Sequence, residues 1–237
     1  AITLPLLNAL SDNNVAVIFC GDNRMPNAML MNLDSNKTQG ESFRAQIEAS
    51  EPLKKGIWKQ VVEAKIRNQA ALLNKLGKDG DLLKPYYSNV KSGDSDNREG
   101  LAARIYWGCL FGNNFVRDRN LPGINELLNY GYTILRSATA RALMGSGLLP
   151  SIGIFHHNRS NAFPLADDIM EPYRPYVDEI VYNMYYDGVL GLNKKTKSEL
   201  LHVLTCDTHF PKVTRPLSIA LTMTAASLVK CYAKELD

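Results

Sequence analysis

The stretch NELLNYGYTILRSATARALM, residues 125–144, decides the fold of this chain. Its apolar and small side chains recur every three or four positions, which is the spacing of one face of an α-helix. This face carries Leu128, Gly131, Leu135, Ala138 and Ala142. Gly145 and Gly147 follow and predict the end of the helix. Because glycine and alanine occupy little space, we expect this helix to pack closely against its neighbours.

The sequence on either side of this stretch is also mainly helical. A helix from Pro52 to Gly77 is predicted to bury one apolar face and to turn its Lys and Arg side chains outward. Asp96 or Asn97 is expected to cap a helix that holds Glu99 in its first turn, and residues 78–97 are expected to form a loop. The other predicted helices cover residues 161–171, with Asn161 as the cap, and residues 216–236.

Two short runs near the start of the sequence predict β-strands. Residues 15–20 are rich in β-branched side chains and lie between turn-forming residues, and residues 28–33 form a weaker second run. Two strands cannot stabilise a sheet alone, so we expect an N-terminal truncation that removes further strands. The predicted fold class is therefore mainly α, with a helical domain at residues 36–237 after a partial β domain at residues 1–35.

Composition and charge restrict the class of protein. The chain has 237 residues, of which 45% are hydrophobic and 22% charged, values that argue against disorder or a fibrous repeat. No uncharged stretch reaches the roughly 18 residues of a membrane helix, and no secretory signal is indicated. The four cysteines lie far apart and are expected to be reduced thiols of a cytoplasmic protein rather than disulfides or zinc ligands.

An acidic segment stands between two basic ones. Residues 162–193 contain six acidic and one basic residue, and ADDIME at 166–171 places three carboxylates on one helical face. Solvent and Arg174 could relieve their repulsion, or a divalent cation could do so. A terpene synthase would need a second acidic motif, which does not follow. Phosphodiester chemistry on nucleic acid is therefore the favoured metal-dependent reaction.

A histidine pair precedes this acidic segment. His156 and His157 are adjacent, so in an extended segment their side chains point to opposite faces and only one can join a given site. An imidazole ligand would favour Mn²⁺ over Mg²⁺. His202 and His209 lack comparable neighbours, and we interpret both as structural or surface residues.

Several blocks together resemble a known family. The blocks are NELLNYGY at 125–132, GLLPSIGIFH at 147–156 and LADDIMEPYRP at 165–175. In this order they resemble the signatures of the CRISPR-associated integrase, which inserts new spacers into the CRISPR array. The stretches HHNRSNAF at 156–163 and EPYRP at 171–175 are most similar to its type II branch. The family begins with a β-sandwich domain, of which residues 1–35 would be a remnant.

The resemblance implies a metal site and a set of DNA contacts. The family's metal triad matches Glu99 in REGLAARIYW at 98–107, His156 and Glu171, which would hold Mg²⁺ or Mn²⁺. Asp168 matches an acidic position that could lie behind the metal ligands or join them. The candidate phosphate contacts are Arg98, Arg104, Arg136, Arg141, Arg159 and Arg174.

The resemblance also implies an activity and partners. The 3′ hydroxyl of a spacer precursor would attack a phosphodiester of the CRISPR repeat in double-stranded DNA, a transesterification. A homodimer and a small adaptation partner protein are implied as well. Two alternatives stay open from the residues: a metal-dependent hydrolytic nuclease on branched or single-stranded DNA, and a non-enzymatic DNA-binding helical scaffold.

Overall fold

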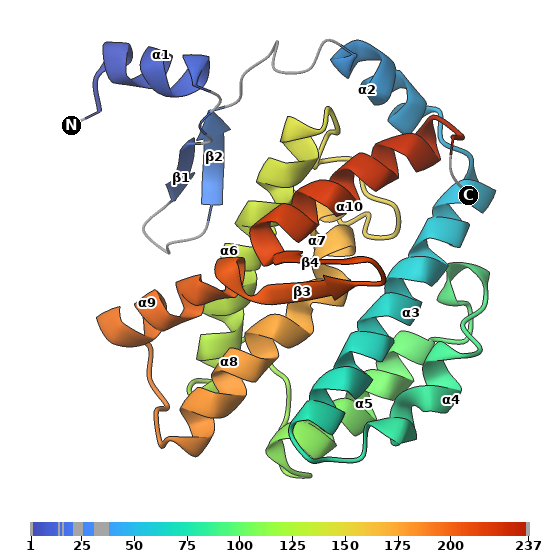
Figure 1. Ribbon diagram of the computed structural model, residues 1–237, viewed down its shortest axis with the longest axis vertical. Helices are drawn as coiled ribbons and strands as arrows, with labels where there is room; N and C mark the ends of the chain where they lie inside the picture. Colours follow the sequence, from blue (N-terminus) through green and yellow to red (C-terminus); the bar gives the residue numbers. More distant parts are fainter. Residues whose placement is uncertain (1, 14, 16, 21–25, 31–37, 236–237) are drawn as a thin grey trace.

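A computed structural model describes residues 2–13, 15, 17–20, 26–30 and 38–235 (Figure 1). Helices dominate these residues, which confirms the predicted mainly α class. The central helix α6 (Ile124–Gly145) packs against α7 (Pro164–Met170), α8 (Arg174–Tyr186), α9 (Lys194–Leu201) and α10 (Leu217–Tyr232). The long helix α3 (Glu51–Lys75) also packs against α7 and α8. It contacts α5 (Arg98–Phe111) as well.

The N-terminal elements lie beside this helical body in Figure 1. Helix α1 (Leu4–Asp12) begins at Thr3, whose hydroxyl accepts the backbone N–H of Leu6, and none of its residues is buried. Strands β1 (Val17–Cys20) and β2 (Pro26–Leu30) pair antiparallel. The expected second strand extends to residue 33, and residues 31–33 lie outside the described residues, as does the expected domain boundary after residue 35.

Helix α3 follows the short helix α2 (Gln39–Ile47) and begins where its sequence predicts. The Ser50 hydroxyl accepts the N–H of Leu53 as an N-cap, and Gly77 adopts a positive φ of 69° just beyond the helix. Ile57 and Val61 are buried as expected. The prediction that every Lys and Arg of this helix faces outward is wrong, because Lys65 is buried.

Residues 78–97 are more regular than the predicted loop. They contain the 3₁₀ turn η1 (Gly80–Leu83), helix α4 (Lys84–Tyr87) and a second turn, η2 (Ser92–Asp94). Asn97 then caps α5 by accepting the N–H of Gly100, as expected. The first turn of α5 therefore places Glu99 where the sequence predicts it.

The close helix contact predicted for α6 occurs at Gly131. A Cβ atom on this glycine would lie 2.3 Å from Cγ1 of Val177 in α8, closer than any real contact. Glycine is therefore required where α6 and α8 cross. Helix α6 also packs against α7, which carries the first part of the acidic segment.

The acidic segment forms three successive elements. After α7, Glu171 begins the 3₁₀ turn η3 (Glu171–Tyr173), and Arg174 begins α8. The predicted Asn161 cap is wrong, because Phe163 is the N-cap residue and makes no side-chain cap. Asn161 instead accepts the Phe163 N–H in a turn before the helix and donates to Asp167.

The C-terminal part contains a hairpin that the sequence pattern does not predict. After the 3₁₀ turn η4 (His202–Thr205), strands β3 (Asp207–Phe210) and β4 (Val213–Pro216) pair antiparallel and lead into α10. Helix α10 spans most of the predicted 216–236 range. The hairpin packs against α10, which it orients across α6 (Figure 1).

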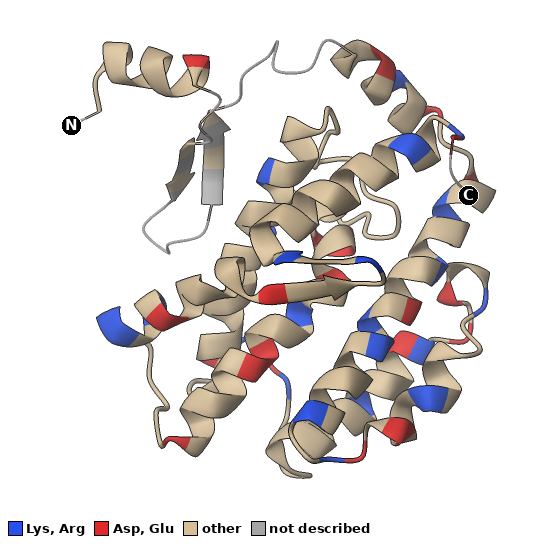
Figure 2. Ribbon diagram, in the orientation of Figure 1, with Lys and Arg blue, Asp and Glu red and all other residues tan. Residues whose placement is uncertain are grey.

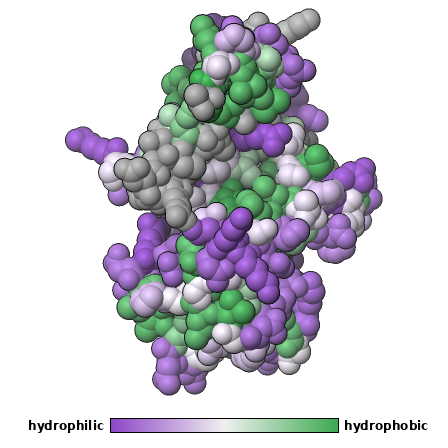
Figure 3. Space-filling model, turned by 90° about the vertical axis from the view of Figure 1, so that its left-hand side faces the viewer, coloured by the Kyte–Doolittle hydropathy of each residue, from purple (hydrophilic) through white to green (hydrophobic). Residues whose placement is uncertain are grey.

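The surface is mixed in polarity and charge. Among the described residues, none of the helices is both long and apolar enough to cross a membrane. Hydrophobic and hydrophilic side chains alternate over the face in Figure 3, and Figure 2 shows basic and acidic segments intermixed on α3 and beside it. Cys109 and Cys206 are free thiols, as expected.

The helical core encloses one carboxylate of α8. Asp178 is 1% exposed and accepts hydrogen bonds from the Tyr106 hydroxyl, at 2.8 Å, and the Tyr132 hydroxyl. Burial raises the pKa of Asp178 to about 6, although the two tyrosines lower it in part. This network joins α5, α6 and α8.

We expect Asp178 to make folding pH-dependent. Because its folded pKa lies above its unfolded one, its stabilising contribution is complete in acid and is lost as the pH rises through about 6. Substitution Asp178→Asn should change the unfolding free energy relative to wild type by about 2 kcal/mol between pH 4.5 and 7, in favour of the variant at pH 7. Urea unfolding at both pH values measures this, with exposed Asp187→Asn as control. If the unfolding free energies of wild type and Asp178→Asn changed equally between the two pH values, the prediction would be contradicted.

Candidate active site

Two of the predicted metal ligands, Glu99 and Glu171, form ion pairs with the same lysine side chain, Lys65. Glu99 comes from the first turn of α5 and Glu171 from the start of η3. Nζ of Lys65, from the middle of α3, lies 2.5 Å from Oε1 of Glu99 and 2.6 Å from Oε2 of Glu171. One ammonium group therefore contacts both carboxylates and joins three elements that are distant in the sequence.

A second cation completes this charged cluster. Nη2 of Arg174 lies 2.7 Å from the other carboxylate oxygen of Glu171. Burial alone would raise the pKa of Glu171, but Arg174 and Lys65 outweigh it and hold the pKa below its ordinary value. Burial lowers the pKa of Lys65, and Glu171 and Glu99 more than reverse this effect. Lys65 and Glu171 are therefore both held in their charged forms.

His156 lies next to this cluster in the loop before α7. Oδ1 of the fully buried Asp168 lies 2.5 Å from Nδ1 of His156, and this hydrogen bond raises the pKa of the imidazole although burial opposes it. The charge of Glu171 raises the same pKa further, which places His156 within electrostatic reach of Glu171. Because Nδ1 is engaged by Asp168, Nε2 is the ring nitrogen left to face a ligand.

Asp168 also holds the backbone of the histidine loop. Its oxygens accept the N–H groups of Ile154, at 2.6 Å, Phe155, at 3.0 Å, and His156, at 3.2 Å. Gly153 permits this approach, because a Cβ there would lie 2.5 Å from the carbonyl oxygen of His156. Asp168 thus lies behind the imidazole of His156, and its role beside a metal ligand stays a prediction.

Two further contacts fix this loop. The Phe155 ring stacks on Trp58 of α3 with centroids 4.3 Å apart and planes 3° from parallel. The buried Gln46 of α2 donates to the carbonyl groups of Leu149 and Ile152 and accepts the Leu149 N–H. His156 is therefore positioned from both sides, whereas His157 is exposed.

An arginine-lined cavity opens beside His156. It has a volume of about 550 Å³, and His156, Asp167 and Asn161 contribute to its wall. Its cationic lining residues are Arg117, Arg119, Arg136 and Arg174. Cations around a cavity of this kind suit a polyanion.

The predicted phosphate-binding arginines separate into two groups. Arg136 pairs with Asp167, at 2.7 Å, and Arg174 pairs with Glu171, and both line the cavity. The others lie outside the cavity wall: Arg98, which pairs with Asp96, and the exposed Arg104, Arg141 and Arg159.

Arg117 and Arg119 are cavity residues that the sequence reasoning missed. Arg117 donates to Oδ1 of Asn125, at 2.9 Å, and of Asn129, at 2.8 Å. Asn125 also donates to the carbonyl of Val116, and Asn129 to that of Arg119. The asparagines of the NELLNYGY block therefore fix the loop that carries both arginines. Their signal in the sequence is two polar side chains four positions apart on a helix, one of them buried.

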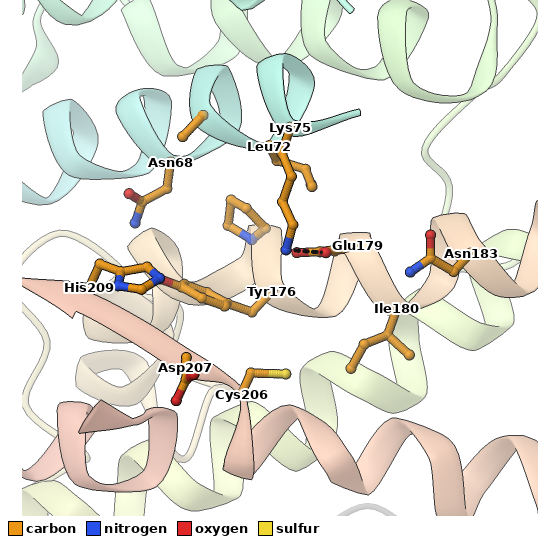
Figure 4. Close-up of a pocket in the computed structure, with 12 residues that line it drawn as sticks. Asn68, Leu72, Lys75, Tyr176, Glu179, Ile180, Asn183, Cys206, Asp207 and His209 are labelled. Atoms are coloured by element: carbon orange, nitrogen blue, oxygen red, sulfur yellow. Dashed lines mark ion pairs between the residues drawn. The ribbon is translucent and has the colours of Figure 1, made fainter. Parts of the chain in front are cut away.

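A second cavity has a different character. It holds about 500 Å³ between α3, α8 and the start of β3 (Figure 4). Lys75 and Glu179 pair across it at 2.5 Å, and Asp207 and His209 lie at its other end. Nδ1 of His209 contacts the Thr214 hydroxyl, in keeping with the expected structural role. Its charges are mixed, so the arginine-lined cavity is the better candidate for a polyanion.

The residues around Lys65 have the right chemistry for a divalent cation. Two carboxylates and an imidazole are a ligand set for Mg²⁺ or Mn²⁺. Oε2 of Glu171 is buried and faces the Lys65 ammonium at 2.6 Å, so this oxygen already serves a positive charge. Within the described ranges, no three His, Cys, Asp or Glu side chains surround one point, because Lys65 lies between the carboxylates. Convergence of Glu99, His156 and Glu171 on one metal stays a prediction.

Comparison with solved structures defines the class of fold. All of the chain aligns with 77% of a casposase bound to integration product, with a TM-score of 0.82 and 22% identity. In a Cas6-RT-Cas1–Cas2 complex, 98% of this chain aligns with 30% of the matched chain, with a TM-score of 0.71 and 22% identity. The helical fold is therefore the one found in casposases and Cas1 proteins.

Sequence comparison defines the family. The model of the family described as CRISPR associated protein Cas1 matches residues 1–208. The CRISPR-associated endonuclease Cas1 of Neisseria meningitidis is 40% identical over 191 residues, which are 80% of this chain and 62% of that protein. A Pyrobaculum aerophilum protein of the same description is 29% identical, over 93% of this chain and 80% of its own length. The chain belongs to the Cas1 family, and it spans 62% of the Neisseria relative.

Proposed function

We propose that this chain is a DNA integrase and endonuclease that joins a DNA 3′ end to a phosphodiester of a CRISPR repeat. The observation that carries the proposal is the position of Arg174, which pairs with Glu171 of the charged cluster and lines the arginine-lined cavity together with His156. A DNA strand in the cavity would place a phosphodiester beside His156 and beside Arg174, the partner of Glu171.

Each residue has a defined part in the proposed reaction. Glu99, His156 and Glu171 would hold Mg²⁺ or Mn²⁺, which supplies charge stabilisation at the phosphodiester and activates the attacking hydroxyl. Asp168 keeps Nδ1 of His156 engaged, so that Nε2 is the nitrogen that would bind the metal. Arg117 and Arg119 bind the strand. The attacking 3′ hydroxyl loses its proton and forms a new P–O bond, the P–O bond to the leaving 3′ oxygen breaks, and that oxygen takes up a proton.

The family branch and the partners are part of the same proposal. Glu171 in the EPYRP stretch and the HHNRSNAF stretch support the type II-like branch. Solved structures similar to this chain include a Cas1–Cas2 complex, so we propose a small partner of that kind, together with a homodimer of this chain. We also keep the division into a β domain at residues 1–35 and a catalytic helical domain at residues 36–237.

Strand transfer into a supercoiled plasmid that carries the repeat tests this function. We expect metal-dependent joining of a labelled short duplex with a 3′ hydroxyl, and no joining when that end is a dideoxynucleotide. Cleavage of branched or single-stranded DNA without joining would instead indicate a hydrolytic nuclease. Binding without either reaction, in the presence of the partner protein, would indicate a scaffold.

DNA binding should weaken steeply with salt. Each arginine that neutralises a phosphate releases a counterion, so Arg117 and Arg119 alone predict at least about a tenfold loss of affinity between 50 and 200 mM salt. Fluorescence anisotropy with a labelled duplex measures this. Arg117→Gln should reduce the slope by about one, whereas Arg215→Gln, on the exposed β4 strand, should leave it unchanged. If log affinity fell equally with log salt concentration for wild type and Arg117→Gln, DNA would not bind at Arg117.

A further inference from the structure

Lys65 occupies the space that a shared metal ion would need. Its Nζ lies within 2.6 Å of a carboxylate oxygen of both Glu99 and Glu171. Mg²⁺ binds carboxylate oxygens at about 2.0 to 2.1 Å, so an ion that bridges the same two oxygens would overlap the ammonium group. The lysine and the bridging ion therefore exclude each other.

The local charges lead to the same conclusion. Lys65 and Arg174 balance the two carboxylates of Glu99 and Glu171. A divalent cation added to this balanced set would meet two positive charges at close range, in a region where Lys65 is only 8% exposed. Such repulsion is weakly screened because little water surrounds the groups.

The Lys65 side chain can move away from the two carboxylates by changing its rotamer. Its four-carbon stem is flexible, and an ammonium group, unlike a guanidinium, makes no bidentate pair that would fix it. Glu171 keeps its contact with Arg174 when Lys65 moves, so only Glu99 then depends on the incoming cation. Movement of one side chain would thus convert the cluster from lysine-filled to metal-filled.

From these observations we infer that Lys65 is a resident cation of the active site, which holds Glu99 and Glu171 together without metal and which Mg²⁺ or Mn²⁺ must displace. This inference rests on the proposed metal site. Lys65 is a positioning residue in this scheme, because it prepares the carboxylates and sets the metal affinity. Substitution of Lys65 should therefore tighten metal binding and should also reduce the stability of the metal-free protein.

Metal titration of the full chain, with no DNA present, tests the inference. Mn²⁺ binding is measured by calorimetry and by the shift of the thermal unfolding midpoint, for wild type and for Lys65→Met and Lys65→Gln. We expect both variants to bind Mn²⁺ at least about tenfold more tightly than wild type. Lys75→Met is the matched control, because Lys75 lies on the same helix but pairs with Glu179. Its Mn²⁺ affinity should equal that of wild type.

The outcomes separate this inference from the function on which it rests. Equal or weaker Mn²⁺ binding by both Lys65 variants overturns the inference. If neither variant folds in EDTA, recovery of the fold by Mn²⁺ supports it and failure to recover overturns it. Glu99→Gln identifies the site: a wild-type Mn²⁺ signal that this variant does not reduce would overturn the metal site itself, and with it the inference.

Discussion

Substitution Glu99→Ala is expected to reduce metal-dependent DNA joining by at least about a thousandfold, because a metal ligand contributes several kcal/mol to the transition state. DNA affinity should stay nearly unchanged. Glu99 is not among the residues of the arginine-lined cavity, so its loss leaves the strand contacts of Arg117 and Arg119 in place. The two effects separate because ligand loss acts on the transition state and strand contacts act on binding.

The measurement pairs single-turnover strand transfer with anisotropy on the same DNA. Glu126→Ala is the matched control, because Glu126 is also a glutamate in the first turn of a helix but is exposed and lies on α6. It should join DNA at the wild-type rate. Near-normal joining by Glu99→Ala would remove Glu99 from the catalytic set, and a parallel loss of DNA affinity would show that it serves binding instead.

The sequence predicts the helices of this protein well because helical periodicity is a local property. The repeated apolar positions of α6, the Ser50 and Asn97 caps and the glycine after α3 each depend on residues a few positions apart. The β3–β4 hairpin escapes this reasoning, because its short strands are largely exposed and have no apolar alternation. Packing against α10, rather than local pattern, explains its formation.

The candidate site was less predictable, because it depends on contacts between residues that are distant in the sequence. The acidic segment and the histidine were found because they are close in sequence, and Glu99 was found only by family resemblance. The sequence predicts Lys65 on the outer face of α3, since a lysine between apolar positions is normally exposed. Its burial depends on Glu99, 34 positions away, and on Glu171, farther still. Arg117 and Arg119 lie in a loop without periodicity, so their place depends on Asn125 and Asn129.

Substitution of Asp168 should have the second large effect on DNA joining, because its buried carboxylate makes two kinds of contact. It orients His156 through Nδ1 and holds three consecutive backbone N–H groups of the histidine loop. An amide at this position keeps the shape but offers one acceptor oxygen in place of two. Loss of a group that orients a metal ligand typically costs about 10 to 100-fold in metal affinity or activity. Each lost hydrogen bond to a charged group costs about 1.5 to 3 kcal/mol of stability.

We therefore expect Asp168→Asn to join DNA about 10 to 100-fold more slowly and to unfold at lower urea concentration than wild type. Asp167→Asn is the matched control, since the neighbouring Asp167 pairs with Arg136 and does not contact His156. The readout specific to orientation is the ¹⁵N chemical shift of the His156 ring, which reports the proton on Nδ1. Asp168→Asn should change the tautomer balance of the ring, and Asp167→Asn should not. An unchanged His156 spectrum together with slower joining would mean that Asp168 acts through fold stability alone, because the imidazole would then keep its orientation without it.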